Sequence, residues 1–206
     1  MKTAPLLLVI ALAGPALAQD RPPITPTRDV SVTYRVSGQG QSAEMRMSWL
    51  AARNMLRVDL PGGVMGWMLV DQRAGTGVMI MDAQRMVMDL PAGQIPRAAM
   101  GAAANARFTR EGPGRFANLD CTQWRTEDQG ETARVCLTAE GVLLRAESIG
   151  GQSAGGGVLE ATAVAFGAQD PARFQRPAGY QTFQMPAGMV PGMPRGTAIP
   201  PPGVTR

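Results

Sequence analysis

The stretch DCTQWRTEDQGETARVCLTAEG, residues 120–141, contains the only two cysteines of the chain, Cys121 and Cys136. Both ends of this stretch are rich in strand-forming residues, whereas residues 127–130 in its middle are typical of a turn. The pattern predicts a β-hairpin, and the paired cysteines predict a disulfide that staples it. A disulfide closing a loop of this size contributes about 3 kcal/mol to stability.

The two cysteines also predict a register for the hairpin. Opposed residues of an antiparallel pair have a constant index sum, so cysteines that face each other would place Gln123 opposite Arg134. The turn would then centre on Asp128 and Gln129, inside the polar cluster. We therefore predict a hairpin whose disulfide joins directly opposed residues.

The N-terminus predicts export. Lys2 supplies a short positive region, residues 6–12 are apolar, and Ala16-Leu17-Ala18 is typical of a cleavage site. We expect a signal peptide over residues 1–18, cleaved after Ala18, and a mature protein in an oxidising compartment, where two cysteines normally pair. The apolar run is too short to cross a bilayer, so we do not expect the protein to span a membrane.

The composition excludes most kinds of side-chain catalysis. The chain has no histidine, and its only lysine is Lys2, within the expected signal peptide. A histidine base, a histidine metal ligand and a lysine Schiff base are therefore excluded from the mature chain. The acidic residues Glu127, Asp128 and Glu131 cluster in the predicted turn, where solvated charge is ordinary. We expect no enzymatic activity and no cofactor.

The charge and the aromatic content argue against a nucleic-acid partner. The formal net charge is only +4, and aromatic residues make up 5% of the chain. Binding of single-stranded nucleic acid requires a basic groove and aromatic stacking platforms. We therefore expect no nucleic acid among the partners.

One β-rich domain is predicted over residues 28–186. It lies between a proline-rich leader, residues 19–27, and a Pro/Gly/Met-rich tail, residues 187–206, that we expect to be disordered. Alternation of apolar and polar residues predicts strands over residues 30–36, 43–49 and 56–60. The next three apolar runs, over residues 64–70, 78–81 and 86–88, are apolar on both faces. Such strands need cover on both sides.

Two short helices are predicted beside these strands. Residues 91–105 are alanine-rich with Pro96 in the first turn, so we expect a helix that carries Ile95 and Met100 towards the sheet. Asp170 and Pro171 can begin a second short helix that carries Phe174.

Three pieces of the chain resemble an exported bacterial family of unknown function, whose fold is similar to that of the lipoprotein-localisation carriers LolA and LolB. They are VSVTYRV at 30–36, the cysteine block over 120–145 and PARFQRPAGY at 171–180. The resemblance implies a mainly β fold: a strongly curved antiparallel sheet, an unclosed half-barrel, with one or two short helices on its concave side. It also implies a periplasmic location. In the carriers, the concave side holds acyl chains.

Apolar side chains on the predicted strands and first helix are therefore candidates for a surface that binds a lipid or acyl chain. Methionine is pliable and suits a variable apolar ligand. The candidates are Met45, Met47, Trp49, Trp67, Met79, Met81, Met86, Met88, Ile95 and Met100. The alternative is that these residues only fill a core between sheet and helix. The protein would then be a structural or interaction protein of the envelope, with a protein partner instead of a small ligand.

The tail offers a minor alternative. Met185, Met189 and Met193 recur every four residues, and thioethers select Cu(I). Prolines 186, 191 and 194 break any helix that would align these side chains, so the tail is a weak candidate for a metal site.

Overall fold

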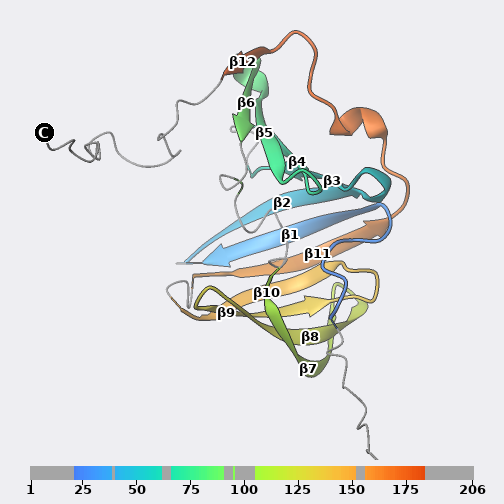
Figure 1. Ribbon diagram of the computed structural model, residues 1–206, viewed down its shortest axis with the longest axis vertical. Helices are drawn as coiled ribbons and strands as arrows, with labels where there is room; N and C mark the ends of the chain where they lie inside the picture. Colours follow the sequence, from blue (N-terminus) through green and yellow to red (C-terminus); the bar gives the residue numbers. More distant parts are fainter. Residues whose placement is uncertain are drawn as a thin grey trace, which may run out of the picture.

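The computed structural model describes residues 21–38, 40–61, 66–90, 95, 105–151 and 156–183. The described residues form one twelve-stranded sheet, together with short 3-10 turns (Figure 1). The predicted mainly β fold and unclosed sheet are therefore confirmed. The expected signal peptide, residues 1–18, and the expected disordered tail, residues 187–206, lie outside the described residues.

The strands are β1 (Val30–Gly38), β2 (Gln41–Leu50), β3 (Met55–Asp59), β4 (Trp67–Asp71), β5 (Thr76–Met81), β6 (Met86–Leu90), β7 (Arg107–Phe116), β8 (Leu119–Asp128), β9 (Glu131–Leu137), β10 (Leu143–Gly150), β11 (Val158–Phe166) and β12 (Gln181–Phe183). The 3-10 turns are η1 (Ala51–Arg53), η2 (Asp82–Gln84) and η4 (Pro171–Phe174).

Two meanders share one sheet. The strand order is β12-β6-β5-β4-β3-β2-β1-β11-β10-β9-β8-β7, so β1 and β11 join the first meander, β1–β6, to the second, β7–β11. Neighbouring strands are antiparallel, except that β12 runs parallel to β6. In Figure 1, β1 and β11 run across the molecule whereas β5 and β6 run along it, which shows the twist of the sheet.

The largest core cluster lies on one face, which we call the inner face. Its central row follows the pairing of Val32 with Met47, Met47 with Val58, and Val58 with Met68. Tyr34 is fully buried beside this row, and its hydroxyl donates a hydrogen bond to the carbonyl oxygen of Leu143 at 2.7 Å. The cluster includes residues from β1 to β11, as expected for a curved sheet that wraps its own core.

The opposite face, which we call the outer face, is covered in two places. Phe174 of η4 packs with Trp67, Ile80 and Val87 of the first meander. At the other end, Ile24 of the leader packs against a cluster of the second meander. Strands β4 to β6 are apolar on both faces, and Phe174 covers their outer face.

The predicted register of the cysteine hairpin is wrong. The structure places Gln123 opposite Cys136, not opposite Arg134. The turn is formed by Gln129 and Gly130, which have φ values of 48° and 83°. Positive φ at both central residues is typical of the hairpin turn whose twist matches the flanking strands, so turn geometry outweighs direct opposition of the cysteines.

The two predicted helices have different outcomes. The first, residues 91–105, lies almost wholly outside the described residues; Ile95 is described, is 7% exposed and packs on the inner face. The second is a 3-10 turn, in which the Asp170 carboxylate accepts a hydrogen bond from Ala172 N at 2.9 Å. It lies on the outer face rather than on the concave side, because Phe174 packs against Trp67 and its neighbours.

Strand β7 is longer than its sequence indicates. Gly112, Pro113 and Gly114 are poor strand formers, yet they continue the pairing with β8 after a bulge between Arg110 and Gly112. Since β7 is the last strand of the sheet, Pro113 does not interrupt a central hydrogen-bond ladder.

Candidate apolar binding surface

Four methionines gather on the inner face of the β5–β6 hairpin. Met79 is paired with Met88, and Met81 with Met86, across adjacent strands. All four side chains are half-buried, whereas Val78, Ile80 and Val87 on the outer face are buried. Pliable methionines therefore occupy the less covered side, and branched aliphatic residues fill the covered one. We call these four residues the methionine quartet.

The quartet continues a row that crosses the sheet. Met68 of β4 is 3% exposed and is paired with Met79. At the sheet edge, Phe183 of β12 is paired with Met88 and is 46% exposed. In the described ranges, the inner face thus changes from buried side chains at β2–β4 to half-buried methionines at β5 and β6 and to the exposed Phe183 at β12.

The sequence does not single out Phe183. The strand β12 that carries it has only three residues, Gln181–Phe183, and adds to β6 in parallel. Three residues are too short for a period-2 pattern to predict a strand. Only the path of the chain around the outer face brings this segment to the sheet edge.

The ten predicted surface residues separate into groups. Met47, Trp49 and Ile95 are buried in the inner core, with exposures of 3%, 8% and 7%, so they fill it. Met45 is half-buried at the margin of the same cluster. Met100 lies outside the described residues. Of the predicted surface residues that the structure describes on this face, the methionine quartet and Met45 are half-buried.

Trp67 lies on the outer face, away from the other candidates. Its ring packs under Phe174, and its Nε1 donates a hydrogen bond to Asp82 Oδ2 at 3.1 Å. The guanidinium of Arg57 lies over the ring, 3.8 Å from its centroid. Trp67 therefore anchors the covering segment and is not part of the inner surface.

The carboxylates nearest the quartet also interact on the outer side. Asp82 accepts hydrogen bonds from Trp67 and from the Tyr180 hydroxyl, the second at 3.0 Å. That hydrogen bond raises the pKa of Tyr180 above its ordinary value. Asp89 forms an ion pair with Arg176. The hairpin thus has its acidic side chains on one face and its thioethers on the other.

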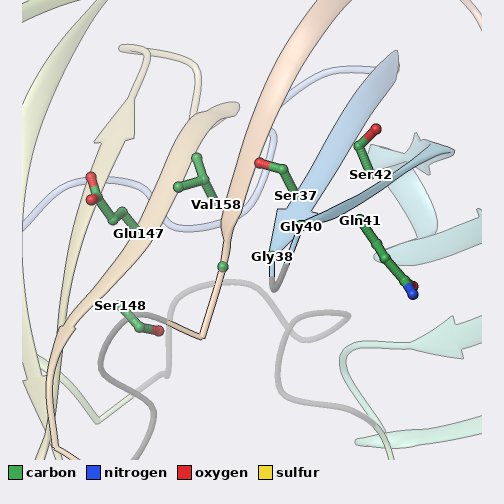
Figure 2. A pocket seen from close by; sticks show the side chains of 9 residues that line it. Ser37, Gly38, Gly40, Gln41, Ser42, Glu147, Ser148 and Val158 are labelled. Carbon is green, nitrogen blue, oxygen red and sulfur yellow. The ribbon is translucent and has the colours of Figure 1, made fainter.

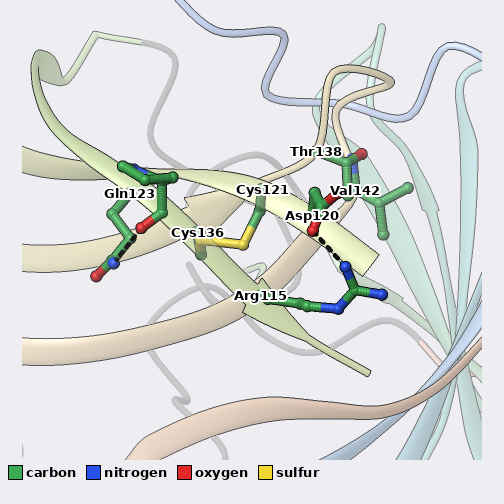
Figure 3. The surroundings of a disulfide bond; sticks show 8 residues. Arg115, Asp120, Cys121, Gln123, Cys136, Thr138 and Val142 are labelled. Carbon is green, nitrogen blue, oxygen red and sulfur yellow. Dashed lines mark hydrogen bonds and ion pairs between the residues drawn. A yellow bond between two sulfur atoms is a disulfide. The ribbon is translucent and has the colours of Figure 1, made fainter. Parts of the chain in front are cut away.

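The disulfide joins β8 to β9 on the inner face of the second meander (Figure 3). The Cα atoms of Cys121 and Cys136 are 5.6 Å apart, which suits a disulfide even though the two residues are diagonal to each other. Gly114 of β7 is paired with Cys121, and a side chain there would come within 2.7 Å of Cys136 Sγ. The glycine leaves room for the bridge.

A shallow, partly polar depression lies at the end of the β1–β2 hairpin (Figure 2). Its volume is about 500 Å³, and its lining includes Ser37, Ser42, Glu147 and Ser148. Its serine and glutamate side chains do not form a nucleophile with a histidine base, since the chain has no histidine.

A second depression, of about 470 Å³, lies between the leader and strands β7–β9. Arg21, Arg110, Trp124 and Thr138 are among its lining residues. Trp124 Nε1 is buried and has no hydrogen-bond partner in the described part of the chain, while the Trp124 ring meets Phe108 edge-on at 6.2 Å. Neither depression includes a residue of the quartet.

Two further observations limit the kinds of site. Within the described ranges, no three His, Cys, Asp or Glu side chains lie together in a way that could hold a metal ion. No helix in the same ranges has the length and apolar character needed to cross a membrane.

Comparisons with known proteins give similarities of fold. No family model matches the sequence, and no curated protein matches it. An uncharacterized conserved protein from Thermus thermophilus is similar with a TM-score of 0.57 and 13% identity, covering 77% of this chain and 91% of that chain. A MucA/MucB complex from Pseudomonas aeruginosa is similar with a TM-score of 0.52 and 12% identity, covering 76% of this chain but only 58% of the matched chain.

A LolA superfamily protein, NE2245 from Nitrosomonas europaea, is also among the similar structures. Its TM-score is 0.37 and its identity 11%, with 74% of this chain and 92% of that chain covered. A LolA superfamily protein is thus one of the solved structures to which this chain is similar.

Proposed function

We propose that this protein is a non-enzymatic binding protein that holds an apolar chain, such as the acyl chain of a lipid, on the inner face of β5 and β6. The observation that carries the proposal is the methionine quartet: four half-buried, unbranched apolar side chains on the less covered side of a hairpin. Methionine adapts its shape to irregular apolar partners.

The energetics of this surface suit an acyl chain. Each methylene group that leaves water contributes about 0.8 kcal/mol to the binding free energy. An acyl chain that lies along the quartet buries several methylene groups and gains this contribution from each. Asp82 and Asp89 interact on the outer face with Tyr180 and Arg176, so the ligand desolvates neither carboxylate. Phe183 extends the apolar surface at the edge.

The proposal includes export to the periplasm and one ligand-binding domain over residues 28–186. The positive, apolar and small-residue segments of residues 1–18 support export, as does the Cys121–Cys136 disulfide. The absence of histidine, and of lysine beyond Lys2, supports a function in binding rather than in acid–base catalysis.

The test is binding of a fluorescent fatty-acid probe to the mature protein, combined with native mass spectrometry of material purified from an exporting host. We expect saturable binding that the substitution Met81→Glu weakens about tenfold or more, because a carboxylate next to the acyl chain must lose its hydration. A co-purified lipid is expected in the native mass spectrum of the unsubstituted protein.

The matched control is Thr76→Glu, which adds the same charge to the same strand at an exposed position. Thr76 and Met81 are an odd number of residues apart on β5, so their side chains lie on opposite faces. Equal weakening by both substitutions, or a protein that binds no probe and is purified free of lipid, would refute the proposal.

A protein partner is the second candidate. One similar structure is a complex of MucA with MucB, and here the exposed Phe183 lies on β12, the terminal strand of the sheet among the described residues. Strand addition at such an edge is a common mode of peptide recognition. Cross-linking in the periplasm would support this function if the wild-type protein gave one defined cross-linked product and Phe183→Glu abolished it.

A further inference from the structure

The quartet has a second chemical property besides its apolarity, because each side chain ends in a thioether sulfur. Two directly opposed pairs, Met79 with Met88 and Met81 with Met86, are adjacent on one face of the hairpin. Opposed residues of an antiparallel pair have their Cβ atoms about 4.5–5.5 Å apart, and neighbours along a strand face lie about 7 Å apart. The flexible methionine side chains can span these separations and direct their sulfur atoms to one point.

The surroundings select the type of ion that such a group would bind. Soft thioethers favour Cu(I), whereas carboxylates favour hard divalent cations. The two acidic residues that flank the hairpin, Asp82 and Asp89, interact on the outer face with Trp67, Tyr180 and Arg176. The ligands on the inner face are neutral, and a monovalent cation is less costly to desolvate among neutral ligands than a divalent one.

The position of the methionines argues for a role other than filling the core. On the outer face of the same two strands, Val78, Ile80 and Val87 are buried in the cluster that includes Phe174. Methionine occupies the four inner-face positions nearest the η2 turn, where the side chains are only half-buried and an ion can reach them. Cys121 and Cys136 are joined in the disulfide, so neither thiol competes for the ion.

From this arrangement we propose that Met79, Met81, Met86 and Met88 form a thioether site for a soft monovalent metal ion, Cu(I). The site lies on the surface to which we assign apolar binding, but it depends on sulfur and not on apolarity. Replacing methionine by leucine removes the sulfur and leaves a side chain of similar volume and polarity. The two functions can therefore fail separately.

The experiment is a competition titration of the full mature protein with Cu(I) and a chromophoric Cu(I) chelator, with ascorbate as reductant and without oxygen. We expect one ion per chain, with sulfur atoms as nearest neighbours in X-ray absorption spectra. The fourfold variant Met79→Leu, Met81→Leu, Met86→Leu, Met88→Leu should bind Cu(I) at least about 100-fold more weakly. Substituting a residue that only supports a metal ligand already lowers metal affinity about 10–100-fold, and here the ligands themselves are removed.

Two control variants make the result specific. Met45→Leu, Met47→Leu, Met55→Leu removes three methionines elsewhere in the sheet and should leave Cu(I) affinity unchanged. Met185→Leu, Met189→Leu, Met193→Leu removes the methionine repeat of the tail and should also leave it unchanged. Circular dichroism and the thermal midpoint show whether each variant is folded.

Three outcomes would overturn the metal site: a wild-type protein that cannot compete with the chelator, a fourfold leucine variant that binds as tightly as the wild type, or loss of binding in the tail variant alone. Binding of the fatty-acid probe is measured on the unsubstituted protein in a separate titration. Cu(I) binding without any probe binding refutes only the apolar-ligand proposal, and probe binding without Cu(I) binding refutes only the metal site.

Discussion

Tyr34 shows how one residue couples the two halves of the molecule. It belongs to β1 of the first meander, is 0% exposed, and donates its hydroxyl hydrogen to Leu143 of β10 in the second. Burial without a charged partner raises the pKa of Tyr34 far above its ordinary value of 10.0. The phenol therefore stays neutral in the folded protein at pH values where it ionises in the unfolded chain.

This difference predicts alkaline destabilisation. The folded-state pKa is raised, so the contribution is complete below pH 10 and is lost as the pH rises above it, because only the unfolded chain then releases the proton. Urea unfolding measured from about pH 8 to 11.5 should show stability falling by up to about 1.4 kcal/mol per pH unit above the ordinary tyrosine pKa.

The substitutions Tyr34→Phe and Tyr180→Phe separate the two tyrosines of the chain. Tyr34→Phe should cost about 1 kcal/mol at neutral pH, because Leu143 loses its donor, and should flatten the alkaline slope. Tyr180→Phe removes a tyrosine that is only half-buried and should leave most of the slope. A Tyr34→Phe variant with an undiminished slope would contradict this assignment.

At the scale of elements, the β8–β9 hairpin shows that turn geometry sets strand register. The sequence places the disulfide in the correct hairpin. The assumption that the cysteines face each other, however, predicts a register that is shifted by two residues: Gln123 is opposite Cys136 and not Arg134. A shift of two keeps both cysteines on the same face, so the disulfide forms in either register. The turn at Gln129 and Gly130 decides between them.

Substitutions in this turn test the register. Gly130 has a φ of 83° and open space around its Cα, so Gly130→Ala should cost about 1–2 kcal/mol through the left-handed backbone alone. Gln129→Asn should instead stabilise the protein by a few tenths of a kcal/mol, since Asn-Gly is preferred in such turns. Urea denaturation with the disulfide intact gives both values. Equal effects at the two positions would contradict a turn centred on them.

Element prediction failed where tertiary position outweighs local preference. Pro113 and its two glycine neighbours disfavour a strand, and only the edge position of β7 makes one acceptable. The sequence predicts a short helix around Phe174, whereas the structure has the 3-10 turn η4, and neither this geometry nor its face follows from the sequence. Packing against Trp67 places it on the outer side.

At the scale of the whole molecule, residues 167–183 act as a covering segment that reaches from β11 to the far edge of the sheet. The segment is held by Phe174, by the ion pair of Arg173 with Asp59, and by that of Arg176 with Asp89. It ends in β12, which adds to β6 beside the methionine quartet. The outer-face packing thus determines which residue, Phe183, borders the inner-face surface.

Truncating the anchor of this segment should affect the entire molecule. Phe174 is 4% exposed, so Phe174→Ala should lower the free energy of unfolding by about 3 kcal/mol. It should also speed amide hydrogen exchange in β12, because the segment that leads into this strand loses its buried anchor. The matched control is Phe183→Ala, 46% exposed in the native protein, which should cost only about 0.5 kcal/mol. Similar losses from the two substitutions would show that η4 is not the anchor.

The sequence alone determined the fold class, most strand positions, the cysteine pairing and the lack of histidine chemistry, because alternation, turn residues and composition act locally along the chain. Only the tertiary structure decided which methionines line an accessible surface and which fill the core. Burial depends on what lies against each face: Ile95, which follows β6, packs on the inner face, and Phe174, from a distant part of the chain, packs on the outer one. Because of the same packing, Trp67 lies on the outer face, away from the predicted surface, and Phe183 lies beside Met88 at its edge.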